Sequence, residues 1–346
     1  MQNDRLSISA KVIADSFHEG SRLTTFELTF PRFILAEFNT HRVLSRNSAS
    51  SRAIPVWRRL VDTITNPFVP LAFGKNKAGM QSAEEVQNED REAARQNWLV
   101  GRDTAVVQAF FLAGGTNQIM SDAKGDPRAA EVCRQIEGLS HEYRDVALRM
   151  RPLSVGVHKQ HANRVLEPYG WHTVIATGTH WRNFYALRAS KMAQPEIQDL
   201  AIAMAQVHLT SVPNMLQSGE WHLPFIFSDD RKEISDVMKL ARISSARCAR
   251  VSYLTHDGKR ALDKDFEMAD GLQSNGHTSP FEHSAMAQST NDPNANRHGN
   301  FGSAWVQYRK MLVGENDFSG LISRESLLEG MKGDEALTNF VLSLPH

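Results

Sequence analysis

The most informative stretch for the architecture is TFELTFPRFILAEFNTHRVLSRNSASSR, residues 25–52. Its first six residues are rich in β-branched and aromatic side chains, which predicts a strand. A similar run with partial alternation, Ser7 to Ile13, precedes it, and Gly20 falls between the two. The pattern therefore predicts two strands joined by a turn.

The segment after this second strand begins with Pro31, a residue suited to the first turn of a helix. Phe33, Ile34, Phe38 and His41 follow at spacings that predict a helix running toward Asn47.

Helices are expected in most of the remaining chain. A helical zone from about Ala83 to Leu148 is interrupted near 114–115 and 125–127, where glycine and proline gather. Further helices are predicted over 178–191, 195–215 and 233–275, the last with a short strand at 249–254, and loops over 66–79 and 289–302. Strands that give way to many helices predict an α+β fold, and the absence of a linker or repeat favours one domain over residues 1–346.

Composition and charge fit a soluble globular protein. The chain is 41% hydrophobic and 23% charged, and its 39 Lys+Arg equal its 39 Asp+Glu. No net field favours nucleic acid or an anionic membrane, so neither partner is expected. Cys133 and Cys248 are too few for a disulfide framework, and the N-terminus lacks an apolar signal core. A cytoplasmic setting is therefore expected.

The first group of chemically useful residues is the segment 40–52, which holds three arginines, a histidine, an asparagine and four serines. Guanidinium and hydroxyl groups donate several hydrogen bonds to oxyanions, so the segment predicts a phosphate site. A solvated helix end with capping serines explains the same composition equally well.

The second group is Arg164 together with the segment 178–188. On a helix, Trp181, Phe184 and Arg188 share one face. An arginine beside aromatic rings either serves packing or lines a pocket for a flat ring, and the segment alone favours packing.

The third group is NGHTSPFEH, residues 275–283, with two histidines and a carboxylate. A lone pair of histidines at this spacing is weak evidence for metal, so no metal is expected. The sequence also lacks a dinucleotide-binding glycine fingerprint, a Walker A loop and a G-x-S-x-G elbow.

Three segments together resemble the flavin-dependent thymidylate synthase family. HRVLSRNSASSR resembles the family's R-H-R signature with its Ser, Asn and final Arg, and TFELTFPRFILAEFN resembles the strand and helix leading into it. RASKMAQPEIQDLA is similar to the family's R-x-x-x-x-A-Q-x-E-I helix. ARVSY and NGHTSPFEH are similar to its N-terminal signature.

The order of these segments departs from the family, because ARVSY and NGHTSPFEH follow the R-H-R signature here instead of preceding it. A circular permutation is the simplest account. The resemblance covers about 22–55, 160–215 and 235–285, which leaves a family-atypical helical region at about 56–150 and an added tail at about 286–346.

The resemblance implies a homotetramer that binds FAD, with NADPH and methylenetetrahydrofolate as co-substrates. It implies transfer of a methylene to C5 of dUMP and its reduction to the methyl of dTMP. Arg188 matches the arginine that polarises the uracil. The positions matching nucleotide contacts are Ser50, Arg52 and Arg164. The positions matching flavin contacts are His41, Arg42, Asn47, Asn183, Ser252, His277 and Ser279.

Some nucleotide-side positions differ from the family pattern. Thr40 stands at the signature's first Arg, Ser48 replaces a Glu, Glu37 stands where a Gln is usual, and Met192 replaces a frequent His. Glu37 and Ser48 are still expected at the substrate, and we expect Arg309, in the motif WVQYRK, to reach the place left at Thr40.

These departures keep three alternatives open. The same chemistry on another pyrimidine nucleotide, such as dCMP methylation or hydroxymethylation, is the closest of them. A non-catalytic flavin or nucleotide binder comes next. A histidine-based metal hydrolase is disfavoured because no compact ligand motif is present.

Overall fold

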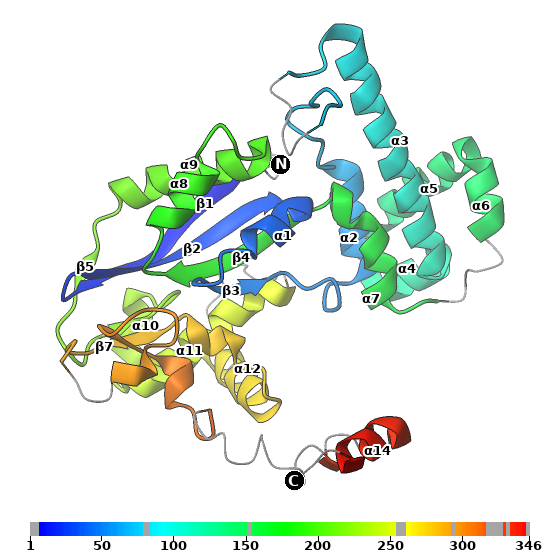
Figure 1. The fold of residues 1–346 in the computed structure, drawn as a ribbon. Coiled ribbons are helices and arrows are strands. Elements are labelled where there is room, and N and C mark those ends of the chain that lie inside the picture. Colours follow the sequence, from blue (N-terminus) through cyan, green and yellow to red (C-terminus); the bar gives the residue numbers. More distant parts are fainter. Residues whose placement is uncertain are drawn as a thin grey trace.

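The computed structural model describes residues 7–78, 84–150, 154, 156–253, 261–291, 295–315, 328–329 and 333–343. It is a mixed α+β structure built on a five-stranded sheet of order β3-β4-β2-β1-β5, with a second, three-stranded sheet of order β6-β7-β8 (Figure 1). The strands are β1 (Ser9–His18), β2 (Ser21–Pro31), β3 (Ser45–Ser48), β4 (Trp171–Gly178), β5 (Asn214–Met215), β6 (Trp221–His222), β7 (Ala285–Ala287) and β8 (Trp305–Gln307).

The N-terminal hairpin confirms the first sequence prediction. β1 and β2 pair antiparallel, with His18 opposite Ser21. The two loop residues between them, Glu19 and Gly20, have φ values of 40° and 78°. Positive φ at both central positions is the backbone of the tight turn whose twist matches paired strands, and Gly20 adopts it without a steric penalty.

The segment after β2 differs from the prediction. Two short helices, η1 (Arg32–Ile34) and α1 (Leu35–Phe38), end at Phe38, and Asn47 lies in a strand. The helix cannot continue to Asn47 because residues 45–48 pair antiparallel with β4, with Asn47 opposite Ile175. Ser and Asn are weak helix formers, so this long-range pairing determines the local conformation.

Helices cover both faces of the large sheet (Figure 1). On one face lie α8 (Arg182–Arg188) and α9 (Pro195–Thr210), and α9 packs on β1 and β2. Buried side chains from these elements, including Phe26, Phe30 and Leu200, form one core. On the other side lie α10 (Ser228–Glu233), α11 (Val237–Ala249), η4 (Arg250–Tyr253), α12 (Leu262–Ser274), η5 (Ser279–Glu282), η6 (Ala295–His298) and η7 (Tyr308–Met311).

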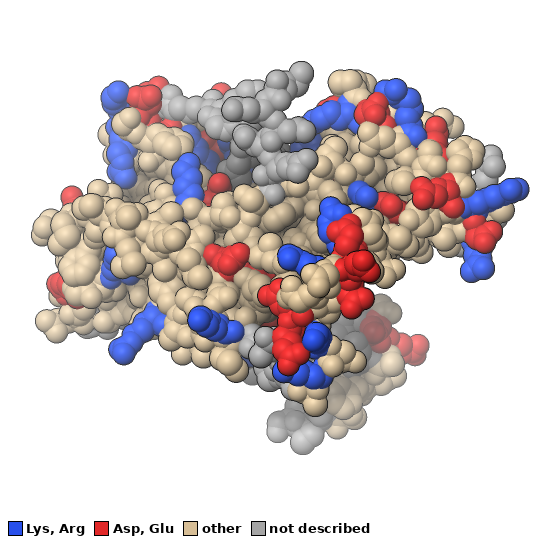
Figure 2. All heavy atoms as spheres, turned by 90° about the horizontal axis from the view of Figure 1, so that it is seen from above, with Lys and Arg blue, Asp and Glu red and all other residues tan. Residues whose placement is uncertain are grey.

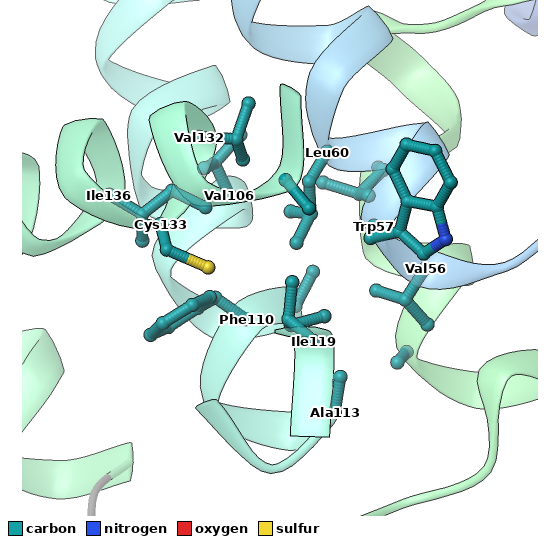
Figure 3. Close-up of a cluster of buried hydrophobic side chains, with 14 of the residues drawn as sticks. Val56, Trp57, Leu60, Val106, Phe110, Ala113, Ile119, Val132, Cys133 and Ile136 are labelled. Atoms are coloured by element: carbon teal, nitrogen blue, oxygen red, sulfur yellow. The ribbon is translucent and has the colours of Figure 1, made fainter. Parts of the chain in front are cut away.

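A group of helices beside the sheet accounts for the predicted helical zone (Figure 1). It comprises α2 (Val56–Thr65), α3 (Asn88–Leu112), α4 (Gly115–Ala123), α5 (Pro127–Glu142), α6 (Arg144–Met150), α7 (Lys159–Ala162) and the 3-10 helix η3 (Asn163–Tyr169). The breaks fall at 113–114 and 124–126, where the glycines and proline predicted them. These helices share a dry core that includes Leu60, Val106, Phe110 and Ile136 (Figure 3).

Other predicted boundaries need correction. Gly178 is the last residue of β4, where it pairs with Thr24, and α8 begins only at Arg182. The helix from Pro195 ends at Thr210, and Met215 pairs with β1.

The strand expected at 249–254 is instead the 3-10 helix η4 over its described residues. It extends α11 directly, and a tightened last turn of this kind is common at helix ends. Residues 289–291 and 295–302, the described part of the predicted loop 289–302, contain no strand or α-helix and include one short turn of 3-10 helix, η6. The C-terminal tail contains α14 (Glu335–Ser343).

The surface charge agrees with the equal numbers of acidic and basic residues in the sequence. On the face shown in Figure 2, acidic and basic side chains are interspersed. None of the helices within the described ranges has the length and hydropathy of a membrane span.

Candidate functional site

The predicted site residues gather around β3, an edge strand of the large sheet. Alternation along this strand points Ser45 and Asn47 into the protein, where they are 1% and 7% exposed. Arg46 and Ser48 are half-buried. The chain before β3 carries Thr40 to Arg42, and the chain after it carries Ser50 to Arg52, so both halves of the arginine- and serine-rich segment flank one short strand.

At the start of β3, the guanidinium of Arg188 is fixed by two hydrogen bonds. Nε donates to His41 Nε2 at 3.0 Å, and Nη2 donates to Thr40 Oγ1 at 3.2 Å. Thr40 Oγ1 donates in turn to the Glu37 carbonyl at 2.7 Å. Burial and then the charges of Arg188 and Arg46 lower the pKa of His41. The ring is therefore a neutral acceptor at pH 7, which holds Arg188 without repelling it.

The helix face predicted for Trp181, Phe184 and Arg188 is present. Trp181 and Phe184 are almost fully buried, with ring centroids 6.2 Å apart. The His41 ring meets Phe184 edge-on at 4.9 Å. The aromatic residues thus serve as packing, and they support the histidine that Arg188 binds. Arg188 itself is only half-buried at the helix end.

Beyond the end of β3, the 3-10 helix η3 holds the loop that carries Ser50 and Arg52. Asn163 Nδ2 donates to the carbonyls of Ser51 at 2.8 Å and Ile54 at 2.9 Å. Arg164, the next residue of η3, is 54% exposed on its side chain. Arg52 is exposed, and its backbone N–H donates to Ser50 Oγ at 3.2 Å. The three predicted phosphate contacts, Ser50, Arg52 and Arg164, therefore belong to one local assembly.

Distant segments reach β3 from the other side. η5 packs against the strand, which places Ser279 and His277 near it as exposed residues. Gln307, from β8, donates through Nε2 to Ser45 Oγ at 3.1 Å and to the Glu282 carbonyl at 3.0 Å. Gln307 therefore ties β8, β3 and η5 together.

Arg309 does not occupy the place expected for it. Its guanidinium pairs with Glu282 and, at 2.6 Å, with Glu315. The guanidinium that contacts Thr40 is that of Arg188. Two carboxylates bind Arg309, because opposite charges at this distance outweigh a contact with a neutral threonine. Its contact with the nucleotide remains a prediction.

The remaining predicted site residues differ in their solvent exposure. Arg42 and Asn183 are exposed, and Glu37 is half-buried. Ser252 lies in η4, and its side chain is outside the described part of the structure.

Three buried polar atoms near these elements find no hydrogen-bond partner among the described residues. They are Asn47 Nδ2, Glu37 Oε2 and His283 Nε2. A buried polar group without a partner is costly, so each of these atoms is a candidate contact for a bound ligand. A donor at Asn47 and the nearby guanidiniums suit the carbonyls and phosphates of a flavin nucleotide, so the residues present fit such a cofactor.

A buried polar chain runs through the sheet behind β3. His222 contacts Ser16 Oγ at 2.9 Å and Thr25 Oγ1 at 2.8 Å, and Thr25 contacts Thr177 at 2.7 Å. Thr177 Oγ1 then contacts His283 Nδ1 at 2.8 Å. Burial lowers the pKa of both histidines to about 3, so both rings are neutral at pH 7.

Sequence reasoning missed Glu167 and His222, and it singled out Gln307 and His283 without identifying their partners. The i,i+3 spacing of Arg164 and Glu167 is a sequence signal for an ion pair. Gln307 carries no such signal, because its partner Ser45 lies 262 positions away. No group of three or more His, Cys, Asp or Glu side chains within the described ranges is arranged to hold a metal ion.

The fold and site together define an α+β protein with guanidinium and hydroxyl groups around an edge strand, a set suited to a phosphate-bearing ligand. Residues 21–214 match the family described as Thymidylate synthase complementing protein, Thy1. This match covers more than half of the 346 residues, so the chain belongs to this family, the flavin-dependent thymidylate synthases. No curated protein matches the chain.

The matched range runs from β2 to β5 and includes the helices α2 to α7. ARVSY and NGHTSPFEH lie outside it.

Proposed function

We propose that this chain transfers a one-carbon unit from methylenetetrahydrofolate to C5 of dUMP and reduces it, giving dTMP. FAD, reduced by NADPH, supplies the hydride when it is bound. The proposal rests on two groups at the two ends of β3. At one end, the Arg188 guanidinium is held by His41 and Thr40. Beyond the other end lie Ser50, Arg52 and Arg164.

The spacing of the two groups suits a nucleotide, which has a base at one end and a phosphate at the other. β3 has four residues between them, about 13 Å of chain at a strand's rise per residue. Arg188 would face the pyrimidine, where its positive charge stabilises negative charge that develops on the ring. Arg52, Arg164 and Ser50 would bind the phosphate.

His41 and Asn47 would complete the site. The lowered pKa of His41 keeps its ring neutral, so it orients Arg188 without adding a charge. The unpartnered Nδ2 of Asn47 would donate to the flavin.

The same proposal includes a circularly permuted single domain. Its support is the contact of the C-terminal segments with β3 and its neighbour β4. η5 packs on β3, Gln307 donates a hydrogen bond to Ser45 of β3, and His283 is hydrogen-bonded to Thr177 of β4. In a circularly permuted domain, the segments moved to the C-terminal end must still pack against the same strands, and these contacts meet that requirement.

We also propose a cytoplasmic homotetramer. Leu209 near the end of α9, Val212 after that helix and Met215 in the edge strand β5 are 83%, 87% and 67% exposed. Large exposed apolar side chains leading into an edge strand suit association with another chain. Both cysteines are buried free thiols, as expected in a reducing compartment.

One observation favours a second substrate, dCMP. The half-buried Glu37 has a carboxylate oxygen, Oε2, without a partner among the described residues. A carboxylate accepts hydrogen bonds, and the exocyclic amine of cytosine donates where uracil offers a carbonyl. Methylation or hydroxymethylation of dCMP is therefore the alternative reaction.

One experiment separates these reactions. Purified FAD-loaded protein is incubated with methylenetetrahydrofolate, NADPH and either dUMP or dCMP, and the products are weighed by mass spectrometry. The proposal expects dTMP from dUMP and unchanged dCMP. A methylated or hydroxymethylated product from dCMP alone would establish the alternative, and no product from either nucleotide would leave only a binding protein.

A further inference from the structure

Glu167 lies in η3 beside the proposed phosphate group and is not one of its expected members. One oxygen, Oε1, accepts hydrogen bonds from Ser51 Oγ at 2.7 Å, Arg164 Nη1 at 3.1 Å and Arg32 Nη2 at 3.2 Å. Its side chain is 26% exposed. A single carboxylate oxygen therefore joins the loop after β3, the end of β2 and η3.

The donors behind Glu167 are themselves fixed. Arg32 Nη1 also donates to His172 Nε2 at 2.9 Å, and His172 is 1% exposed. Burial, followed by the charges of Arg32 and Arg59, holds the pKa of His172 well below its usual value, so the ring is a neutral acceptor. Arg59 donates to the Trp171 carbonyl at 3.2 Å. Arg32 thus presents a rigid guanidinium to Glu167.

The electrostatic balance of this group depends on Glu167. Its charge acts on Arg32 and Arg59, and it pairs with Arg164. Asp62, the other carboxylate near Arg59, is half-buried, and burial raises its pKa. Glu167 therefore offsets the mutual repulsion of the Arg164 and Arg32 guanidiniums, both of which it contacts.

The loop carrying Ser50 and Arg52 is held from η3 by two side chains of different kinds. Asn163 binds the backbone carbonyls of Ser51 and Ile54, and Glu167 binds the Ser51 hydroxyl. Asn163 fixes the path of the loop, whereas Glu167 links the loop to the Arg164 guanidinium.

We propose that Glu167 is the positioning residue of the phosphate subsite, holding Arg164 and the Ser50–Arg52 loop in the arrangement that recognises a nucleoside monophosphate. This inference rests on the proposed function. It predicts that replacing Glu167 weakens binding of the ligand's phosphate and leaves binding of its base and sugar unchanged.

The test compares dUMP with deoxyuridine, which lacks the phosphate. Dissociation constants are measured by calorimetry for the FAD-loaded full chain and for its Glu167→Leu and Glu167→Gln variants. Glu167→Leu should weaken dUMP binding about tenfold, the usual scale for a lost charge-assisted hydrogen bond, and leave deoxyuridine binding unchanged. In turnover, KM for dUMP should rise and kcat should stay within about twofold.

Glu167→Gln keeps the shape and one acceptor oxygen, so it should fold where the leucine variant fails. It should weaken dUMP binding about threefold, since Ser51 keeps its acceptor and only the charge is lost. Combining Glu167→Leu with Ser51→Ala should give less than the sum of the two single effects, because both changes remove the same hydrogen bond.

Glu131→Gln is the matched control. It removes an i,i+3 partner of Arg134 in α5, away from β3, and should alter neither ligand. Equal weakening of dUMP and deoxyuridine, or no effect on dUMP, would overturn the role of Glu167. Failure of the unaltered protein to bind dUMP at all would instead overturn the proposed function.

Discussion

The helical region beside the sheet and the surroundings of β3 differ in the polarity of their buried side chains. The core of α2 to α6 consists of apolar side chains such as Leu60, Phe110 and Ile136 (Figure 3). Around β3, by contrast, buried positions hold Ser45 and Asn47. Apolar packing without polar atoms maximises stability, whereas buried polar groups cost stability unless a partner satisfies them. From this difference we predict a structural role for the helical region and a ligand-binding role for β3.

The largest expected effect separates stability from binding. Phe110→Ala, in the helical core at 2% exposure, should lower the free energy of unfolding by about 3–5 kcal/mol. Affinity for FAD and dUMP should be unchanged below the new melting temperature. Urea unfolding and ligand titration measure the two quantities, with the partly buried neighbour Phe111→Ala as a milder control. Loss of ligand affinity in the folded Phe110 variant would contradict the claim that the helical core serves stability and the surroundings of β3 serve binding.

Arg188→Ala should give the converse result. Removing a guanidinium aimed at developing charge should reduce kcat by about 10²–10³-fold, with little change in melting temperature, since the side chain is half-buried at a helix end. The matched control is Arg182→Ala, exposed at the start of the same helix, which should keep normal turnover. Equal rates for the two variants would mean that Arg188 is not at the reacting pyrimidine.

Acid should destabilise the β3 side of the protein. His222 and His283 have pKa values of about 3 in the folded state, against about 6.5 when unfolded. Between these values the unfolded chain binds protons that the folded chain does not. Stability is therefore complete above pH 6.5 and falls as the pH decreases.

From pH 7 to 5 the expected loss is about 2 kcal/mol for each of these two histidines. Urea unfolding across this range measures it, and His222→Gln should remove that residue's share of the slope. His41, His172 and His208, whose pKa values are also lowered, contribute to the remainder. A stability that does not change between pH 7 and 5 would show that the folded rings bind protons as readily as the unfolded ones, so that folding does not lower their pKa values.

The smallest effect concerns an atom without a partner. Asn47→Ala removes a buried donor that no described residue satisfies, so the stability of the ligand-free protein should change by about 1 kcal/mol or less. FAD affinity should fall about tenfold, because the bound cofactor loses that donor. Flavin fluorescence titration measures this affinity, with the exposed Asn39→Ala as control. Unchanged FAD binding would indicate that Asn47 faces no flavin.

Local signals predicted the parts of the fold that depend on local physics. Gly20 marked the hairpin turn, and the glycines and proline near 114 and 125 marked the helix breaks. β3 was taken for a helix because its identity comes from pairing with β4, about 130 residues later. The same reason hid the contact of Gln307 with Ser45.

The candidate site was predictable mainly through its family resemblance. Composition alone left the 40–52 segment open between a phosphate site and a capped helix end. The structure adds the contacts between Arg188 and His41 and between Glu167 and Ser51, which bring separate motifs together. It also assigns Arg309 to carboxylate partners, which its sequence spacing did not indicate.

The central claim is that the ligands bind around β3, and hydrogen–deuterium exchange measured with and without FAD and dUMP tests it directly. We expect slower exchange over residues 39–52, in η5 and at the end of α8 when both ligands are present, with no change in α3 to α6. Protection confined to the helices α3 to α6, or no protection near β3 at saturating ligand, would contradict this account.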